Sequence, residues 1–470
     1  MFVNESKLTN YRKGNPMRSM ISIKPQFNYS LKNDHPVAQK FYDKYNQIDL
    51  ILDSKIEILK EFHQELCITM NVFKGRESQY STESIFRMLL TKCIEQLSFR
   101  DLLIRVNDSM FLRNFTRIGW GKLMSIGLLD AAWKCISSST WDTINKHLLS
   151  YAIEKEQVTE TDLRVDSTVC ESNIHYPTDS SLLWDSYRVL SRELRVIMYS
   201  HPSLQNGFRF HERKIKQLHT LISTRSGNQK NATKRLVKRA MKALIKRVET
   251  ILEKGRMVVQ TAQALHILGI KEQLGTLLLN VELVTIQSRR SQINDEVVPA
   301  KDRIFSIFED HTELLIRGKA RKPNEFGHMV TLGQTREKFI SYFAVDIISD
   351  HDTKQKNIVL ESHKESFGSY PQRFAADKNY YVSMDDVKQW EAVIDTYAIG
   401  KKGKRTQDET EREHTESFRE MQKFRAGCEG TISVLKRVFG LARCAYRTFK
   451  SFASSIGRLV FCHNIVLLAT

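Results

Sequence analysis

Apolar side chains recur at three- and four-residue steps through the first third of the chain. Two such series are Ile48, Leu52, Ile56, Leu59 and Phe62, and Ile85, Leu89, Cys93 and Leu97. This spacing is typical of amphipathic helices, and serines that suit helix N-termini stand at Ser98 and Ser137. We therefore predict that residues 36–155 form an all-helical region, either a plain bundle or one that contains a helix-turn-helix. Residues 1–35 are polar and basic, and are expected to form an arm.

The pattern changes to that of a strand near residue 163. Leu163, Val165 and Val169 alternate with polar residues, as in a half-buried strand. Helical periodicity then returns, and after it short segments alternate. We predict strands over 327–332, 339–348, 372–376 and 392–399, and helices over 357–366, 383–391 and through residue 429. The predicted fold is mixed α/β: residues 160–180 and 300–470 form a sheet domain, interrupted after its first strand by a helical, basic insertion at 181–299.

The charge of the chain narrows the choice of partner. Its 470 residues carry 72 Lys and Arg against 54 Asp and Glu, a formal net charge of +18. Residues 209–247 hold 13 basic residues and one acid, and residues 423–458 hold eight basic residues and one acid. Concentrated positive charge binds polyanions, so double-stranded DNA is the first partner to consider. For residues 234–248 alone, a solvated helix face is an equal alternative.

Other classes of protein fit the sequence less well. No uninterrupted apolar run reaches the ~18 residues of a bilayer-spanning helix, and the opening residues lack the apolar part of a secretory signal. The seven cysteines form no Cys-x-x-Cys pair and are odd in number, which argues against a disulfide framework or a zinc module. We therefore expect a cytoplasmic protein with no membrane partner, whose reduced cysteines serve in packing.

Three acidic residues stand at distinctive points in the predicted order of elements. Asp166 lies within the first strand, Asp377 ends a later strand, and Glu429 lies on a helix beyond the last strand. Carboxylates that converge from two strands and a helix suit two Mg²⁺ ions, which would clamp the attacking and leaving oxygens of a displacement at phosphorus. A single acid is more often a solvated surface residue, so only the placement of all three carries this prediction.

The surroundings of Glu429 can be examined by helix geometry. If the segment is one helix at ~100° per residue, Arg425 and Lys436 lie within about 40° and 20° of Glu429, beside an apolar stripe. A surface ion pair between Arg425 and Glu429 is the alternative. Gly427 and Gly430 each cost about 1 kcal/mol within a helix, which favours a close approach of backbone or ligand at this turn.

Three segments resemble one known family. LRVDSTVCESNIHYPTDSSLLWDSYRVL (163–190), RFAADKNYY (373–381) and FRAGCEGTISVLKRVFGLARCAYR (424–447) resemble DDE transposases of bacterial insertion sequences, in particular the ISNCY-like group. Segments 97–115 and 461–469 resemble the same family, so the resemblance spans about residue 80 to the end. It implies an RNase H-like catalytic domain, DNA cleavage and joining with two Mg²⁺ ions, for which Mn²⁺ can substitute, and a catalytic, metal-binding triad of Asp166, Asp377 and Glu429.

The resemblance also implies DNA contacts. A signature of related transposases, Tyr-x2-Arg-x3-Glu-x6-Lys, is met at Arg425, Glu429 and Lys436, while Gln422 stands in place of the tyrosine. By this resemblance Arg425, Lys436 and the neighbouring Arg437 would bind DNA phosphate near the cleavage point.

Two further positions belong to the resembling segments. Asn379 stands where the family usually has glycine, and we expect it to keep a left-handed turn. His175 or Asp179 would position a metal-bound water or DNA, unless residues 175–180 cap the helix that follows. We favour the cap.

The leading hypothesis is therefore a transposase. It would bind the terminal inverted repeats of its element, expose 3′-OH ends and join them to target DNA, as a homodimer in the synaptic complex. One alternative is an RNase H-like nuclease or resolvase that cuts without strand transfer. Another is a catalytically decayed relic that only binds DNA, against which the three intact acids argue.

Overall fold

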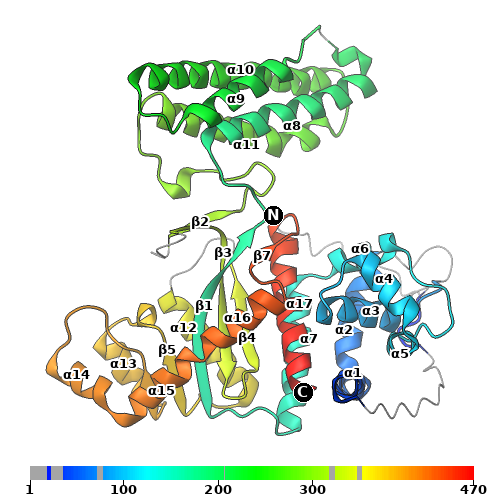
Figure 1. The fold of residues 1–470 in the computed structure, drawn as a ribbon, viewed down its shortest axis with the longest axis vertical. Coiled ribbons are helices and arrows are strands. Elements are labelled where there is room, and N and C mark those ends of the chain that lie inside the picture. Colours follow the sequence, from blue (N-terminus) through cyan, green and yellow to red (C-terminus); the bar gives the residue numbers. More distant parts are fainter. Residues whose placement is uncertain (1–17, 23–34, 71–77, 206, 317–322, 347–351) are drawn as a thin grey trace. The chain divides into compact units, whose positions relative to one another are not determined.

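The computed structural model describes residues 18–22, 35–70, 78–205, 207–316, 323–346 and 352–470. Most of the predicted arm, residues 1–35, lies outside them. The fold is mixed α/β, as predicted: helices make up most of the described chain, and its strands form one mixed sheet (Figure 1).

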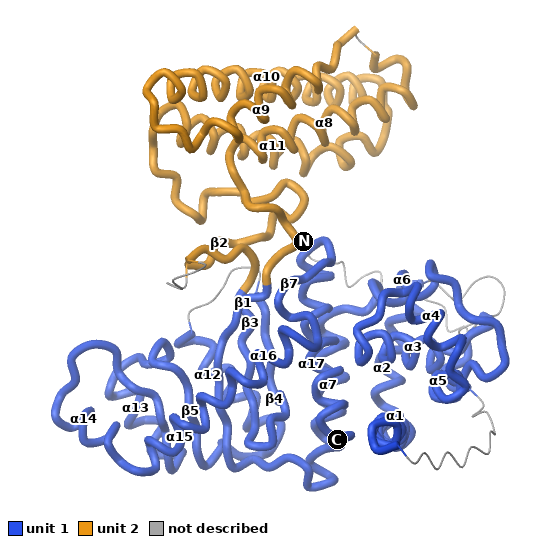
Figure 2. The backbone as a smooth tube through the Cα atoms, viewed as in Figure 1, with its two compact units in different colours: residues 1–170, 329–470 blue, residues 171–328 orange. Residues whose placement is uncertain are grey.

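The chain forms two compact units (Figure 2). The first combines residues 1–170 with 329–470, and the second consists of residues 171–328. The predicted boundaries at 155, 180 and 300 do not coincide with those of the units. The reason is that the helices within 36–155 share one apolar core with strands and helices from the far end of the chain.

Every element that the structure describes before the first strand is a helix, as predicted. These helices are α1 (Pro36–Ser54), α2 (Ile56–Thr69), α3 (Thr82–Ile94), α4 (Phe99–Asp108), α5 (Met110–Phe115), α6 (Ile126–Cys135) and α7 (Ser138–Glu154). Both predicted caps are present. The Ser98 hydroxyl accepts a hydrogen bond from the backbone N–H of Asp101 in α4, and the Ser137 hydroxyl accepts one from the N–H of Thr140 in α7.

Strand β1 (Asp162–Ser172) lies at the centre of the sheet. The other strands are β2 (Glu313–Ile316), β3 (Asn324–Thr335), β4 (Ile340–Val345), β5 (Arg373–Ala376), β6 (Thr396–Ala398) and β7 (Arg443–Cys444). The order is β2-β3-β1-β5-β6, with β4 paired to β3 and β7 to β1. β5 runs parallel to β1 and to β6, whereas β3 is antiparallel to β2 and β4. Four predicted strands are confirmed, the one over 392–399 is shorter than predicted, and β2 and β7 were not predicted.

The two faces of the sheet differ. The helices after β4 are α12 (Asp352–Phe367), α13 (Met384–Glu391), α14 (Gln407–His414), α15 (Glu416–Ala426), α16 (Cys428–Val438) and α17 (Phe449–Leu468). One face packs apolar residues of β1, β5 and β6 against α12 and α13. On the other face Ala375 and Ala398 pack against α15. Because side chains alternate along a strand, Arg164 and Asp166 lie on the α15 side of β1.

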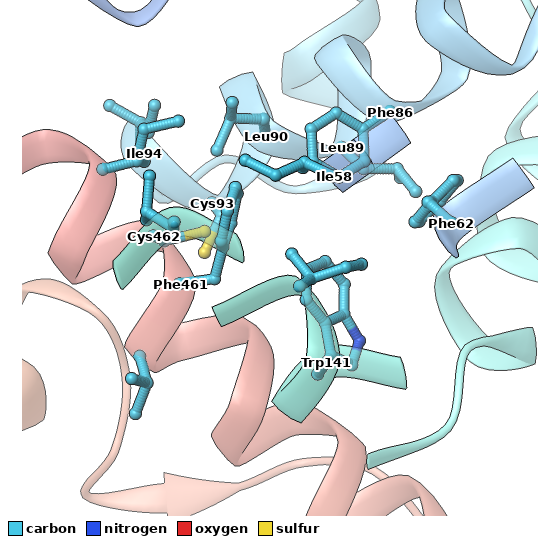
Figure 3. Close-up of a cluster of buried hydrophobic side chains, with 14 of the residues drawn as sticks. Ile58, Phe62, Phe86, Leu89, Leu90, Cys93, Ile94, Trp141, Phe461 and Cys462 are labelled. Atoms are coloured by element: carbon cyan, nitrogen blue, oxygen red, sulfur yellow. The ribbon is translucent and has the colours of Figure 1, made fainter. Parts of the chain in front are cut away.

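Helix α17 completes the core of the first unit. It packs against α1, α3 and α7, and Figure 3 shows its Phe461 and Cys462 beside Trp141 of α7 and Cys93 of α3. Gly457 allows a close approach, because a Cβ there would lie 2.6 Å from Cβ of Trp141. Among the described residues, α17 alone is long and apolar enough to cross a membrane, but 72% of that stretch is buried, as in a core helix.

The second unit is built mainly from helices between β1 and β2. They are α8 (Asp179–Ser200), η2 (Pro202–Leu204), α9 (Glu212–Arg225), α10 (Asn231–Ala264), α11 (Ile270–Gln292) and η3 (Ala300–Asp302). Leucine, isoleucine and valine side chains from α8, α9, α10 and α11 form a core of their own. The predicted helical insertion after the first strand is therefore present, within a unit that also contains β2.

Candidate active site

Asp166 and Asp377 occupy equivalent positions on neighbouring strands. β1 and β5 are parallel, and their last paired residues are Val165 and Ala376. The next residue of each chain segment is an aspartate, so the backbones of Asp166 and Asp377 follow directly from this pair of strands, which are about one strand spacing (~4.8 Å) apart. Both residues are partly exposed. The structure thus brings these two predicted site residues together.

Asp166 is held on one side by its own strand and on the other by α15. Its Oδ1 accepts a hydrogen bond from the backbone N–H of Ser167 (2.8 Å). Its Oδ2 lies 3.8 Å from a terminal nitrogen of Arg425, and 17% of the Asp166 side chain is exposed. The carboxylate therefore meets a positive charge while keeping access to solvent.

Ser167 links β1 to residues on the opposite face of the sheet. Its hydroxyl lies 2.5 Å from the hydroxyl of Tyr380 and donates to Oδ1 of Asp352 (3.3 Å). Burial, and then the nearby charge of Asp352, raise the pKa of Tyr380 well above its ordinary value. Tyr380 therefore stays a neutral hydrogen-bonding group beside Asp166. None of these three residues was predicted, since each is a common residue type without a motif.

Glu429 lies in the first turn of α16 and is exposed. Next to Glu429 in the chain lies the buried thiol of Cys428, on which the charge of Asp166 also acts. Burial chiefly, together with the negative charges of Asp166 and Glu429, raises the pKa of Cys428 to about 12.

The predicted single helix through Glu429 is wrong. It is interrupted at Gly427, where α15 ends and α16 begins. The interruption is one residue long, and Gly427 keeps a right-handed helical conformation (φ −63°, ψ −15°). Arg425 donates from Nε to the side-chain oxygen of Gln422 (3.2 Å) and reaches Asp166.

A buried arginine explains the break. The Arg164 guanidinium donates to the carbonyl oxygen of Phe424 (2.6 Å) at the end of α15 and to the side-chain oxygen of Gln334 on β3. A Cβ at Gly427 would overlap the Arg164 guanidinium. The close approach predicted at this turn is confirmed for Gly427. At Gly430 no protein backbone approaches closely, because no atom outside its own helix lies within 4 Å of where its Cβ would be.

The same network fixes the start of α16. Gln334 donates from Nε2 to the hydroxyl of Thr431 (2.7 Å), which lies one helical position beyond Gly430. Arg164 is buried, and its charge stands between two apolar residues of the strand pattern. A charged residue at this position of the strand pattern is the sequence signal that could have indicated a buried structural role for Arg164.

Gln422 anchors α15 to the sheet. Its Nε2 donates to the carbonyl oxygens of Ala398 (2.5 Å) and Ala376 (3.3 Å), the last residues of β6 and β5. Its oxygen accepts from Arg425. The amide thus satisfies two strand-end carbonyls and orients the arginine at once.

The remaining predicted residues lie on α16, in η4 or in the second unit. Lys436 is partly buried on α16, and the exposed Arg437 donates to the carbonyl oxygen of Ser433 (3.4 Å). Asn379 lies in the short helix η4 (Lys378–Tyr380) without a positive φ, so the expected left-handed turn is not formed.

Residues 175–180 act as a cap, as favoured. Thr178 and Ser181 form a capping box at the start of α8. Asp179 accepts hydrogen bonds from Ser291 (2.7 Å) and Arg303 (2.7 Å) of the same unit. His175 lies 3.5 Å from Asp185, also in this unit.

The two basic stretches differ in structure. On α10 the basic side chains are mostly exposed, opposite the buried apolar ones: Lys234, Arg235, Arg239, Lys242, Lys246 and Arg247. In the second stretch Arg447 and Lys450 are exposed, but Arg458 is buried in α17. Only part of the second stretch therefore contributes to a positive surface.

The donor chemistry of the site suits a hard cation, although its carboxylates are spread out. Within the described residues, no three His, Cys, Asp or Glu side chains stand close enough to form a metal-binding group. Mg²⁺ does not require one, because it binds through one or two carboxylates and completes its shell with water and substrate phosphate. Asp166 and Asp377, on neighbouring strands, fit that mode.

No protein-family model, curated protein or solved structure matches this chain.

Proposed function

We propose that this protein is a DDE transposase that cleaves DNA at the ends of a mobile element and joins those ends to target DNA. The observation that carries the proposal is that Asp166 and Asp377 each follow the last residue pair of the parallel β1–β5 pairing, and Glu429 would complete the triad from the first turn of α16. The strand order, with an antiparallel β4-β3 pair followed by β1, β5 and β6, is the order expected of an RNase H-like domain.

Asp166 and Asp377 would hold the metal ions, with Glu429 as a third ligand. Bound Mg²⁺ would lower the pKa of a water nucleophile and stabilise the negative charge on the reacting phosphate in the transition state. The chain itself would orient the reacting carboxylate, because Arg425 and the Ser167 N–H hold the two oxygens of Asp166. Arg425 would also contribute positive charge to the scissile phosphate, with the fork geometry that suits phosphate oxygens.

Positive surfaces support a nucleic-acid substrate. The exposed basic side chains of α10 would bind the phosphate backbone without reading sequence. Lys436 and Arg437 of α16 would bind phosphate nearer to the reacting bond. Pairing of two element ends would use two copies of the chain.

The test is cleavage of labelled duplexes that tile the DNA flanking the coding region, with Mg²⁺ or Mn²⁺. Wild type is compared with Glu429→Gln under conditions where both bind the duplex equally. The matched control is Glu416→Gln, an exposed acid in the first turn of α15. We expect metal-dependent cutting at one position and joining of the 3′ end by wild type and the control, and neither reaction by Glu429→Gln.

Other outcomes would replace the proposal. Binding without cutting by wild type would indicate a DNA-binding relic. Cutting without joining would indicate a nuclease or resolvase. Equal cutting by wild type and Glu429→Gln would remove Glu429 from the site.

A further inference from the structure

A polar pocket lies in the first unit, and its lining residues are not part of the candidate active site. Its volume is about 180 Å³, and its lining comes from α3, α6 and α17 and from the segment around β7. The pocket runs inward from exposed residues such as Gln96 and Ala445 to buried ones such as Cys93 and Arg458. By the same measure one water needs only ~10 to 15 Å³, so the pocket has room for a polyatomic ion.

Arg458 is a buried cation with few partners. It is 4% exposed, and its guanidinium stacks on the ring of Trp133, 3.6 Å from the ring centroid. One terminal nitrogen donates a long hydrogen bond to the carbonyl oxygen of Trp133 (3.4 Å). Its Nε has no hydrogen-bond partner among the described residues. A guanidinium has five N–H donors, so most of the donating capacity of Arg458 is available to a ligand.

Lys92 brings a second positive charge to the same pocket. Its ammonium nitrogen lies 4.4 Å from the centroid of the Trp133 ring. Burial, and then the positive charge of Arg458, lower the pKa of Lys92. Two cations thus share one aromatic ring and repel each other.

The pocket contains no acid to balance these charges. None of the described residues that line it is Asp or Glu, and no described carboxylate forms an ion pair with Arg458 or Lys92. A buried charge without a partner is costly. A bound anion would therefore lower the cost of burying these two positive charges.

We propose that this pocket binds a phosphoryl group, held by Arg458 and Lys92. A fork of N–H donors beside a compact ammonium suits the several oxygens of a phosphate, whereas a carboxylate would leave one cation without a partner. The phosphoryl group would come either from free phosphate or from the 5′ end of a DNA strand. This site does not depend on the proposed transposase activity, since neither residue belongs to the triad or its contacts.

The test measures the melting temperature of the full chain at constant ionic strength. The probes are inorganic phosphate, a 5′-phosphorylated dinucleotide and the same dinucleotide without the phosphate. We expect a saturable rise of a few degrees with one or both phosphorylated probes and none with the third. A rise with inorganic phosphate indicates free phosphate as the ligand, and a rise with only the phosphorylated dinucleotide indicates a strand end.

Variants separate specific binding from general salt effects, because phosphate at high concentration stabilises most proteins. Lys92→Met keeps the aliphatic stem beside Trp133, and it should weaken binding at least about tenfold, since it removes a charge-assisted hydrogen bond. Arg447→Gln, an exposed cation outside the lining, should bind as wild type does. Arg458→Met should abolish binding if it folds.

The titration of wild type with the three probes tests the proposed phosphoryl site even if Arg458→Met does not fold. Absence of saturable stabilisation in wild type would overturn the proposal. So would equal stabilisation of wild type and Lys92→Met. The first result would point to a balancing group within the chain, such as the buried thiol of Cys93, whose pKa is lowered by its hydrogen bond with Cys462 and then by the charges of Arg458 and Lys92.

Discussion

Two aspartates of β1 mark the two ends of its pairing with β5, the amino end at Asp162 and the carboxyl end just before Asp166, and their surroundings differ. Asp162, at the amino end, is fully buried between two arginines: Arg373 donates to it from Nε and a terminal nitrogen (2.6 and 2.7 Å), and Arg336 also donates to it. Asp166, four residues along the same strand, has one arginine at 3.8 Å and is open to solvent. Arg373 is also the residue paired with Asp162 in the β1–β5 register.

This difference is one of burial and of distance to the cations. At Asp162 both oxygens accept hydrogen bonds from arginines at a fully buried position, so the group stabilises the strand pair. At Asp166 the side chain is 17% exposed and the Arg425 nitrogen lies 3.8 Å away. Under the proposed function, Asp162 is a structural carboxylate and Asp166 a metal-binding one.

The largest effect should come from breaking the amino end. Asp162→Ala would leave two guanidiniums without their carboxylate and should lower the free energy of unfolding by about 3 kcal/mol. This is the lower end of the range for a broken buried ion pair, because both arginines are partly exposed. Urea unfolding of the variant and wild type measures it. A change below about 1 kcal/mol would contradict the structural role.

Next to the amino end of β1, His363 of α12 should make the free energy of unfolding depend on pH. His363 donates from Nε2 to the carbonyl oxygen of Glu160, just before β1, and burial lowers its pKa from 6.5 to about 4. Between pH 6.5 and 4 the unfolded chain takes up a proton that the folded chain does not. Stability is therefore present above pH 6.5 and is lost as the pH falls, by roughly 3 kcal/mol for this group.

His363→Gln retains an amide donor and does not titrate. Its unfolding midpoint should fall less steeply with decreasing pH than that of wild type. Identical slopes for the two proteins between pH 6.5 and 4 would show that His363 is not responsible.

At the carboxyl end the expected effect is on activity and not on stability. Asp166→Asn keeps the shape of the side chain but removes its charge. Under the proposed function, cleavage should fall more than about 100-fold, since even the loss of a residue behind a metal ligand costs 10- to 100-fold. The free energy of unfolding should stay within about 0.5 kcal/mol of that of wild type. A variant that is destabilised as strongly as Asp162→Ala would erase the contrast between the two ends.

The smallest effects concern the two glycines beside the carboxyl end. Gly427→Ala should displace Arg164 and lower the free energy of unfolding by about 1 to 3 kcal/mol, as overpacking does. Gly430→Ala meets no atom within 4 Å outside its helix and should raise it by up to about 1 kcal/mol. Thermal unfolding of the two variants side by side measures both, and changes of the same sign would contradict the assigned contacts.

The fold class and the placement of the two aspartates on strands could be predicted because both follow from local patterns. Alternation marked β1, and the element order placed Asp377 at the end of a strand. The break at Gly427 could not be predicted, because its cause, Arg164, lies on another strand more than 250 residues away in the chain. The shared core of the first unit was missed for a similar reason: the contact between Asn145 and Gly457 joins residues 312 positions apart.

Short or context-dependent features also escaped prediction. β2 and β7 have four and two residues, too few for a period to show. The second basic stretch was interpreted as surface charge, yet Arg458 is buried, because α17 is apolar on several sides and its arginine stacks on Trp133. Charge counts along a chain do not distinguish exposed cations from buried ones.

The position of α17 in the sequence has a consequence for the order of assembly during synthesis. Its partners α1, α3 and α7 leave the ribosome between about 300 and 400 residues before it does. Meanwhile residues 171–328 are made as one continuous segment with a core of their own. Since domains generally fold as they are synthesised, we expect the inserted unit to fold first and the early helices to wait, their apolar faces within reach of chaperones, until α17 emerges.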